Sequence, residues 1–152
     1  MSVNWQKASK VKTPANSSGF LLWQVYHLWH RRINSALKPL KLTHMQFVLL
    51  ACTGWLTREK ILLKQKQLSD FANIDVMTVS QVLRTLEKKG LVIRESHPND
   101  PRSHSLRLST NGAKVLERAL PIVEELDSIF LDFQSQNIAL ILSSILKRNS
   151  KL

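Results

Sequence analysis

The sequence predicts a mainly α-helical fold of six helices with one short antiparallel β hairpin. Two observations support this fold class. Apolar residues recur at steps of three and four over most of the chain after residue 18, as they do on one face of a helix. Between residues 91 and 109, two short β-type runs flank a stretch of turn-forming residues. The 152 residues contain no internal repeat and suffice for one domain with a complete hydrophobic core.

The first helix is expected over residues 19–38. Ser17 or Ser18 can cap its start, and Pro39 ends it because proline cannot continue a helix. Apolar side chains at helical spacing would form its buried face, and these are Leu21, Leu22, Val25, Leu28, Trp29, Ile33, Ala36 and Leu37.

A capping box predicts the start of the second helix. The Thr43 hydroxyl can accept a hydrogen bond from the amide of Gln46, whose side chain can reach back to the cap residue. The helix that follows, from Phe47 to about Trp55, is nearly all apolar. We therefore expect it to be buried on most of its sides.

Two shorter helices are expected at about residues 67–73 and 76–89. Asp75 is a suitable cap for the second of them, and Gly90 can adopt the left-handed conformation that ends it. The second helix has one apolar stripe with spacing i, i+3, i+4 and i+7, made of Val79, Val82, Leu83 and Leu86.

The hairpin is expected to pair Leu91–Glu95 with Ser105–Ser109. The residues between the strands, 97–103, include the turn formers proline, asparagine and aspartate. A long helix should follow from about Asn111 to Phe133, with a kink at Pro121, and Ile138–Lys147 should form the last helix.

The charge of the chain favours a polyanionic partner. Its net charge is +11, and residues 1–57 hold seven basic and no acidic side chains. Such an excess suits nucleic acid or an anionic membrane surface. Residues 1–18, which are polar and contain several lysines, are expected to form a flexible basic arm, either a passive tail or a contact to the partner.

The compartment is expected to be the cytoplasm. Cys52 is the only cysteine, so no internal disulfide can form, which fits a reducing environment. No stretch approaches the roughly 18 apolar residues of a membrane span, and the N-terminal residues have no hydrophobic signal core. We expect no membrane association.

The order of the expected elements is that of a winged helix-turn-helix. In that motif, the second helix of the pair lies in the major groove of duplex DNA and the hairpin contacts the flanking backbone or minor groove. The helix at 76–89 would be the reading helix. Its polar side offers groups that can bind base edges or phosphates, and these are Thr78, Ser80, Gln81, Arg84, Thr85 and Lys88. Lys89 and Arg94 are further candidates for phosphate contacts.

Several segments in order closely resemble the MarR family of bacterial transcriptional regulators. They are LTHMQF at 42–47, TVS at 78–80, LEKKGLVIR at 86–94, PNDPR at 98–102 and LSTNG at 108–112. The resemblance covers about residues 20–148. It implies a single domain over residues 19–152, with the winged helix-turn-helix at about 43–110 and dimerisation helices at about 19–38 and 111–148.

The resemblance also implies an obligate homodimer that binds an inverted-repeat operator and acts as a ligand-responsive repressor. In the wing, Asp100 would orient Arg102 for entry into the minor groove, where a narrow A·T-rich groove favours a guanidinium group. The sequence departs from the family pattern at Pro101 and Gln81, where the family commonly has arginine. Proline at 101 makes the wing less basic. Glutamine at 81 means that the operator sequences of relatives are a poorer guide to the operator of this protein.

In this family, small effectors bind between the dimerisation helices and the DNA-binding lobe. The resemblance therefore suggests an effector pocket in that region. Its candidate lining residues are Trp23, His27, His30, Arg31, Cys52 and Trp55. Core or dimer packing is the alternative role for the tryptophans, and an inert buried thiol is the alternative for Cys52.

Other functions have less support in the sequence. His27 and His30 are spaced like a zinc-binding pair, but no cysteine or carboxylate cluster completes the shell, so we expect no metal and no cofactor. An enzyme is not expected, because the chain lacks a glycine-rich phosphate loop, a nucleophile elbow and a His–carboxylate cluster. RNA-binding domains often carry aromatic residues on a β-sheet, and this sequence lacks such motifs. A winged-helix module that binds a protein partner without specific DNA reading is the main alternative.

Overall fold

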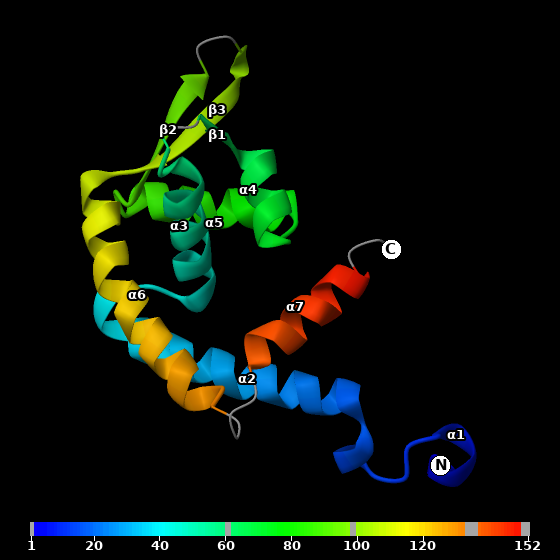
Figure 1. Cartoon of the computed structure of the whole chain (residues 1–152). Coiled ribbons are helices and arrows are strands. Elements are labelled where there is room, and N and C mark those ends of the chain that lie inside the picture. Colours follow the sequence, from blue (N-terminus) through cyan, green and yellow to red (C-terminus); the bar gives the residue numbers. More distant parts are fainter. Residues whose placement is uncertain (1, 60–61, 98–99, 133–136, 150–152) are drawn as a thin grey trace.

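The computed structural model describes residues 2–59, 62–97, 100–132 and 137–149, and of residues 96–97 and 100–104 the backbone alone. Figure 1 shows the arrangement of the elements. Within the described residues there are seven α-helices and one three-stranded antiparallel sheet. The helices are α1 (Trp5–Ala8), α2 (Ser18–Leu37), α3 (His44–Thr57), α4 (Gln65–Ala72), α5 (Val76–Lys88), α6 (Thr110–Phe130) and α7 (Ile138–Asn149), and the strands are β1 (Leu63–Lys64), β2 (Val92–His97) and β3 (Asp100–Leu108).

The predicted fold class is confirmed, with two elements added. The extra helix is α1, a single turn inside the predicted arm, where the Asn4 side chain accepts a hydrogen bond from the amide of Lys7 at 3.3 Å. The extra strand is β1, in which Leu63 pairs with Leu106 of β3. Both elements are too short to produce a periodic pattern in the sequence.

The predicted helix caps are confirmed. Ser17 caps α2 by accepting from the amide of Phe20 at 3.3 Å. The capping box of Thr43 and Gln46 is complete, so α3 begins at His44, ahead of the predicted start. Asp75 accepts from the amide of Thr78 at 2.8 Å and caps α5.

Helix α5 is fixed by its apolar stripe and by its end. Val79, Leu83 and Leu86 are fully buried, and Val82 is partly buried. Gly90 has a φ of 67°, the left-handed conformation expected of a residue that ends a helix. The burial of one stripe determines which side of α5 faces solvent.

The wing is longer than predicted. Strands β2 and β3 are paired from Val92 with Leu108 out to His97 with Asp100, with a register irregularity at Ser96/His97. The prediction of a loop over 97–103 was therefore wrong for residues 97 and 100–103, while residues 98–99 lie outside the described part of the chain. Pro101 fits in β3 because β1 pairs only near Leu106, so Pro101 lies where β3 has a free edge.

The start of α6 is tied closely to the base of the wing. The Ser109 hydroxyl accepts from the amide of Gly112 at 2.8 Å and donates to the carbonyl of Gly90 at 2.6 Å. The amide of Ser109 donates to the carbonyl of Leu91 at 3.0 Å. A Cβ added at Gly112 would lie 1.9 Å from the oxygen of Leu91, so only glycine permits this approach.

The helices α3–α5 with the sheet form one part of the molecule and α2 with α6 the other (Figure 1). The two parts share one apolar core. In the first part, α3 packs against α4, α5 and the sheet, and in the second, α2 packs against α6. Ile33 and Leu37 of α2 and Ala119 of α6 are fully buried in the same apolar cluster as Leu50 of α3. No helix in the described ranges is both long enough and apolar enough to cross a membrane.

The effect of three glycine-to-alanine substitutions on stability should depend on which atoms the new methyl group contacts. Gly112→Ala should lower the free energy of unfolding by about 2 kcal/mol or more, because the backbone oxygen of Leu91 cannot move aside. Gly54→Ala should cost less, since its closest neighbour at 2.9 Å is the flexible side chain of Leu116. Gly19→Ala, with no atom within 4 Å, should be neutral or stabilising by up to about 1 kcal/mol. Urea unfolding at one protein concentration measures all three, and a stable Gly112→Ala variant would contradict the described approach.

Candidate nucleic-acid interface

The outward side of α5 has a single polar row. Gln81, Arg84 and Lys88 are all exposed, and their spacing of three and four residues places them on one side of the helix. That side is opposite the stripe that packs into the core. The row therefore faces solvent on a helix that cannot rotate without exposing fully buried side chains.

The other candidates on α5 flank this row. Thr78 and Ser80 are partly buried, and the amide of Thr78 is held by Asp75. The Thr85 hydroxyl donates to the carbonyl of Gln81 at 3.2 Å, one turn earlier in the helix. Hydrogen bonding from Thr78 lowers the pKa of the Asp75 carboxyl, so the cap is ionised at neutral pH.

Two predicted phosphate ligands are engaged within the fold. The Lys89 ammonium donates to the carbonyl of Lys41 at 2.6 Å and to Gln46 Oε1 at 2.7 Å, which connects the end of α5 to the start of α3. Only 18% of the Arg94 side chain is exposed, and its guanidinium lies 4.0 Å from Glu87. In this structure, both groups support the position of α5.

The wing candidates Asp100 and Arg102 lie on β3, and their side chains are outside the described part of the structure. The proposed orientation of Arg102 by Asp100 stays a prediction. Nearer the base of the wing, Arg107 forms an ion pair with Glu95 across the strands at 2.5 Å, and this contact lowers the pKa of Glu95.

Comparisons with known proteins agree with this architecture. The MarR family model matches residues 42–104, which run from the start of α3 into the wing. The HTH-type transcriptional regulator YdcH of Bacillus subtilis (strain 168) is 43% identical over 122 residues, which cover 80% of this chain and 83% of that protein. The chain belongs to the MarR family.

Solved structures of MarR-family regulators share its fold. A mutant of MarR from E. coli in complex with operator DNA has a TM-score of 0.74 and 26% identity, covering 97% of this chain and 98% of that one. MepR of S. aureus in complex with DNA has a TM-score of 0.78 and 22% identity, covering 90% of this chain and 98% of that one. The winged helix-turn-helix prediction is thereby confirmed as the fold of this MarR-family chain.

Three of the six predicted effector-pocket residues lie together along α2. The rings of Trp23 and His27 are 4.3 Å apart, and Tyr26 lies between His27 and His30, 5.4 and 5.5 Å from their rings. The row continues to α3, where the His44 ring lies 5.0 Å from that of His30. We refer to these rings as the aromatic row. Their role in binding an effector stays a prediction.

The other three predicted pocket residues are not members of the aromatic row. Arg31 is exposed on α2, and Trp55 is 57% exposed on α3, with the Arg58 guanidinium 4.0 Å from its ring. Cys52 is partly buried, and burial raises the pKa of its thiol, which disfavours the reactive thiolate.

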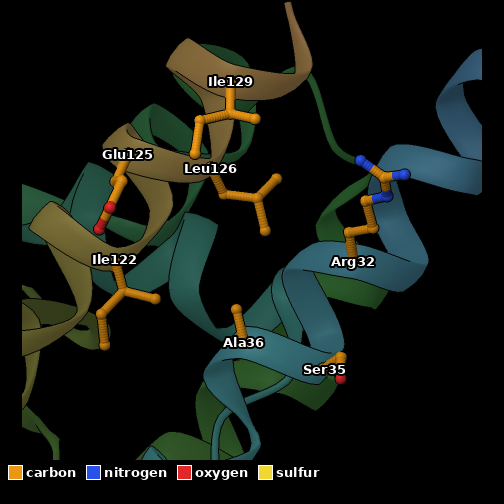
Figure 2. Close-up of a pocket in the computed structure, with 7 residues that line it drawn as sticks. All are labelled: Arg32, Ser35, Ala36, Ile122, Glu125, Leu126 and Ile129. Atoms are coloured by element: carbon orange, nitrogen blue, oxygen red, sulfur yellow. The ribbon is translucent and has the colours of Figure 1, made fainter.

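A groove of about 460 Å³ lies elsewhere, between α2 and α6 (Figure 2). None of the six predicted pocket residues lines it. It is lined by Arg32, Ser35 and Ala36 of α2 and by Ile122, Glu125, Leu126 and Ile129 of α6. Sequence periodicity placed such residues on helices but could not show which faces of α2 and α6 oppose each other.

The contact between His30 and His44 joins the two parts of the molecule. Their Nδ1 atoms lie 2.8 Å apart, so one ring donates its proton and the other accepts. Asn34 holds both backbones, donating to the carbonyl of His30 and accepting from the amide of His44, each at 2.9 Å. The Trp29 indole lies against His44 and donates to Asp127 of α6 at 2.7 Å. Sequence analysis missed His44 because its partner is contributed by another helix.

The structure also shows a residue that the sequence interpretation overlooked on α5 itself. Met77 is 71% exposed and lies four residues before Gln81, which is the helical spacing of the polar row. The DNA-contact prediction for α5 included only polar side chains. The four-residue spacing between Met77 and Gln81 was the sequence feature that could have identified it.

Acid should destabilise the protein through His44. Burial lowers the pKa of His44, His30 lowers it further, and Asp127 opposes the shift. Between this lowered value and the ordinary histidine pKa near 6.5, the unfolded chain binds more protons, so stability falls as pH drops through that window. His44→Gln should lose less stability than the wild type between pH 7.5 and 5.5, as measured by urea midpoints at one protein concentration. Equal losses for the two proteins would contradict this role of His44.

Proposed function

We propose that this MarR-family chain is a homodimeric repressor that binds a specific duplex-DNA operator and releases it when a small effector binds. The observation that carries the proposal is the polar row on α5. Its three side chains are exposed on a helix whose opposite side is fully buried in the core. A solvent-facing row held rigidly in this way can enter the major groove without a conformational change.

Each member of the row has a role that follows from its chemistry. Gln81 can donate to and accept from one adenine, and Arg84 can donate two hydrogen bonds to one guanine. Lys88, at the end of α5, would bind a phosphate of the flanking backbone. The MarR and MepR structures with bound DNA support this use of the shared fold.

A second copy of the chain would cover apolar surface that one copy leaves in water. Helix α7 has no buried residue, yet it exposes Leu140, Ile141, Leu142, Ile145 and Leu146. Helix α2 exposes further apolar side chains toward its start, including Phe20, Leu21 and Leu22. Exposed apolar surface on this scale indicates an interaction surface. We assign it to the dimer, which would place two α5 helices for an inverted repeat.

The effector part of the proposal rests on the aromatic row. These rings connect α2, which would belong to the dimer, with α3, which packs directly against α5. A flat apolar ligand that displaces a ring of this row would therefore disturb both parts. We place the effector beside Trp23, His27 and His30 on this basis.

Two variants of the row should separate specificity from affinity. Gln81→Ala should weaken binding to the selected operator by about tenfold or more while changing binding to random DNA little, because it removes a base contact. Lys88→Ala should weaken both alike and reduce the dependence on salt, because it removes a phosphate contact. Titrations of both DNAs at several salt concentrations test this. Equal operator and random-DNA losses for Gln81→Ala would exclude its base-reading role.

A charge on the apolar side of α7 should separate the dimer. Ile145→Lys should give a folded monomer at micromolar concentration with greatly weakened operator binding, because Ile145 is 53% exposed in one copy and would be buried between two. Ser143→Lys, which adds the same charge on the opposite side of α7, is the matched control and should stay dimeric. Sedimentation measures the oligomeric state of both variants and of the wild type. A monomeric wild type would overturn the proposed assembly.

A further inference from the structure

The row of outward side chains on α5 includes one apolar member. Met77, Gln81, Arg84 and Lys88 have the spacing i, i+4, i+7 and i+11, so all four lie on the same side of the helix. Met77 is 71% exposed and begins the row in the first turn of α5. A long apolar side chain in that position is stabilised only when it contacts another apolar group.

The surroundings of Met77 do not suit a phosphate. The Asp75 carboxylate caps the start of α5 and accepts from the amide of Thr78 at 2.8 Å. This interaction lowers the pKa of Asp75, which keeps the negative charge at the end of the helix where an anion would otherwise bind. The Gln65 side chain donates to the carbonyl of Val76 at 3.2 Å and connects the start of α4 to that of α5. This end of α5 is therefore rigid, negatively charged and apolar at its tip.

The major groove of DNA offers an apolar group that matches such a tip. Each thymine exposes its 5-methyl group there, and no other standard base has one. The first residues of the second helix in a helix-turn-helix are those that reach base edges. An unbranched thioether side chain adapts its shape to a small apolar partner.

We propose that Met77 reads a thymine by contact with its 5-methyl group. The inference rests on the proposed function and deepens it, since it assigns the base class at one operator position in each half-site. Four residues of helix extend about 6 Å. The thymine should therefore lie within about two base pairs of the base that Gln81 contacts, because successive base pairs are about 3.4 Å apart.

The test removes only the methyl group. An operator is first selected from random duplexes by the wild-type protein, and each thymine in one half-site is then replaced singly by deoxyuridine. At one position, the replacement should weaken wild-type binding about fourfold, the value of one buried methyl group, and replacement in both half-sites should weaken it more than tenfold.

Variants of Met77 test whether this residue causes the loss of binding on deoxyuridine replacement. Met77→Ala, which removes the side chain from both subunits, should bind the thymine operator as weakly as the wild type binds the operator with deoxyuridine in both half-sites. It should lose nothing further when the methyl groups are absent. Met77→Leu should keep most of the methyl sensitivity, because it keeps the apolar contact. Gln81→Ala is the control on the same row and should retain the full deoxyuridine effect at that position.

The possible results are distinguishable. Failure of the wild type to select any operator would overturn the proposed function and this inference with it. A selected operator that tolerates every deoxyuridine would leave the proposed function intact and overturn the inference. A sensitive position at which Met77→Ala loses as much as the wild type would also overturn it, since another residue would then contact the methyl group.

Discussion

Helix α3 is apolar on most of its sides, so neighbouring elements must cover it from several directions. Leu49 and Leu50 are fully buried, and the hydroxyl of Thr53, equally buried, donates to the carbonyl of Leu49 at 2.7 Å. Helices α4, α5 and α6 and strand β3 all pack against α3. Gly54 lets α6 come close, because its missing side chain leaves room for Leu116. The positions of α5 and of the long helix α6 both follow from the need to bury this one segment.

The fold could be predicted where a short run of residues determines its own structure. The Thr43–Gln46 capping box, the Asp75 cap and the left-handed Gly90 each depend on neighbours within a few positions. The missing parts depend on distant partners. Strand β1 exists because Leu63 pairs with Leu106, and the outer wing is strand because the pairing of β2 with β3 continues into the stretch predicted as a turn.

The same distinction applies to the candidate site. Helical spacing was enough to place Gln81, Arg84 and Lys88 on one side of α5, because the buried stripe fixes the opposite side. It could not show that the Lys89 ammonium binds Gln46, 43 residues away. Nor could it show the His30–His44 contact, which joins two helices, or which faces of α2 and α6 enclose the groove. Spacing along one helix is a local property, whereas the partner of a charged or aromatic group is decided by packing.

Helix α6 is anchored at both ends to different parts of the protein. Near its start, Ser109 holds the base of the wing through Gly90, and near its end, Asp127 accepts from Trp29 of α2. Its 21 residues, with Pro121 among them, span about 30 Å. A tilt of about 6° at one end of an element of this length displaces the other end by about 3 Å, the length of a hydrogen bond. Because α6 is hydrogen-bonded near both ends, a small displacement at α2 would be carried along it to the base of the wing.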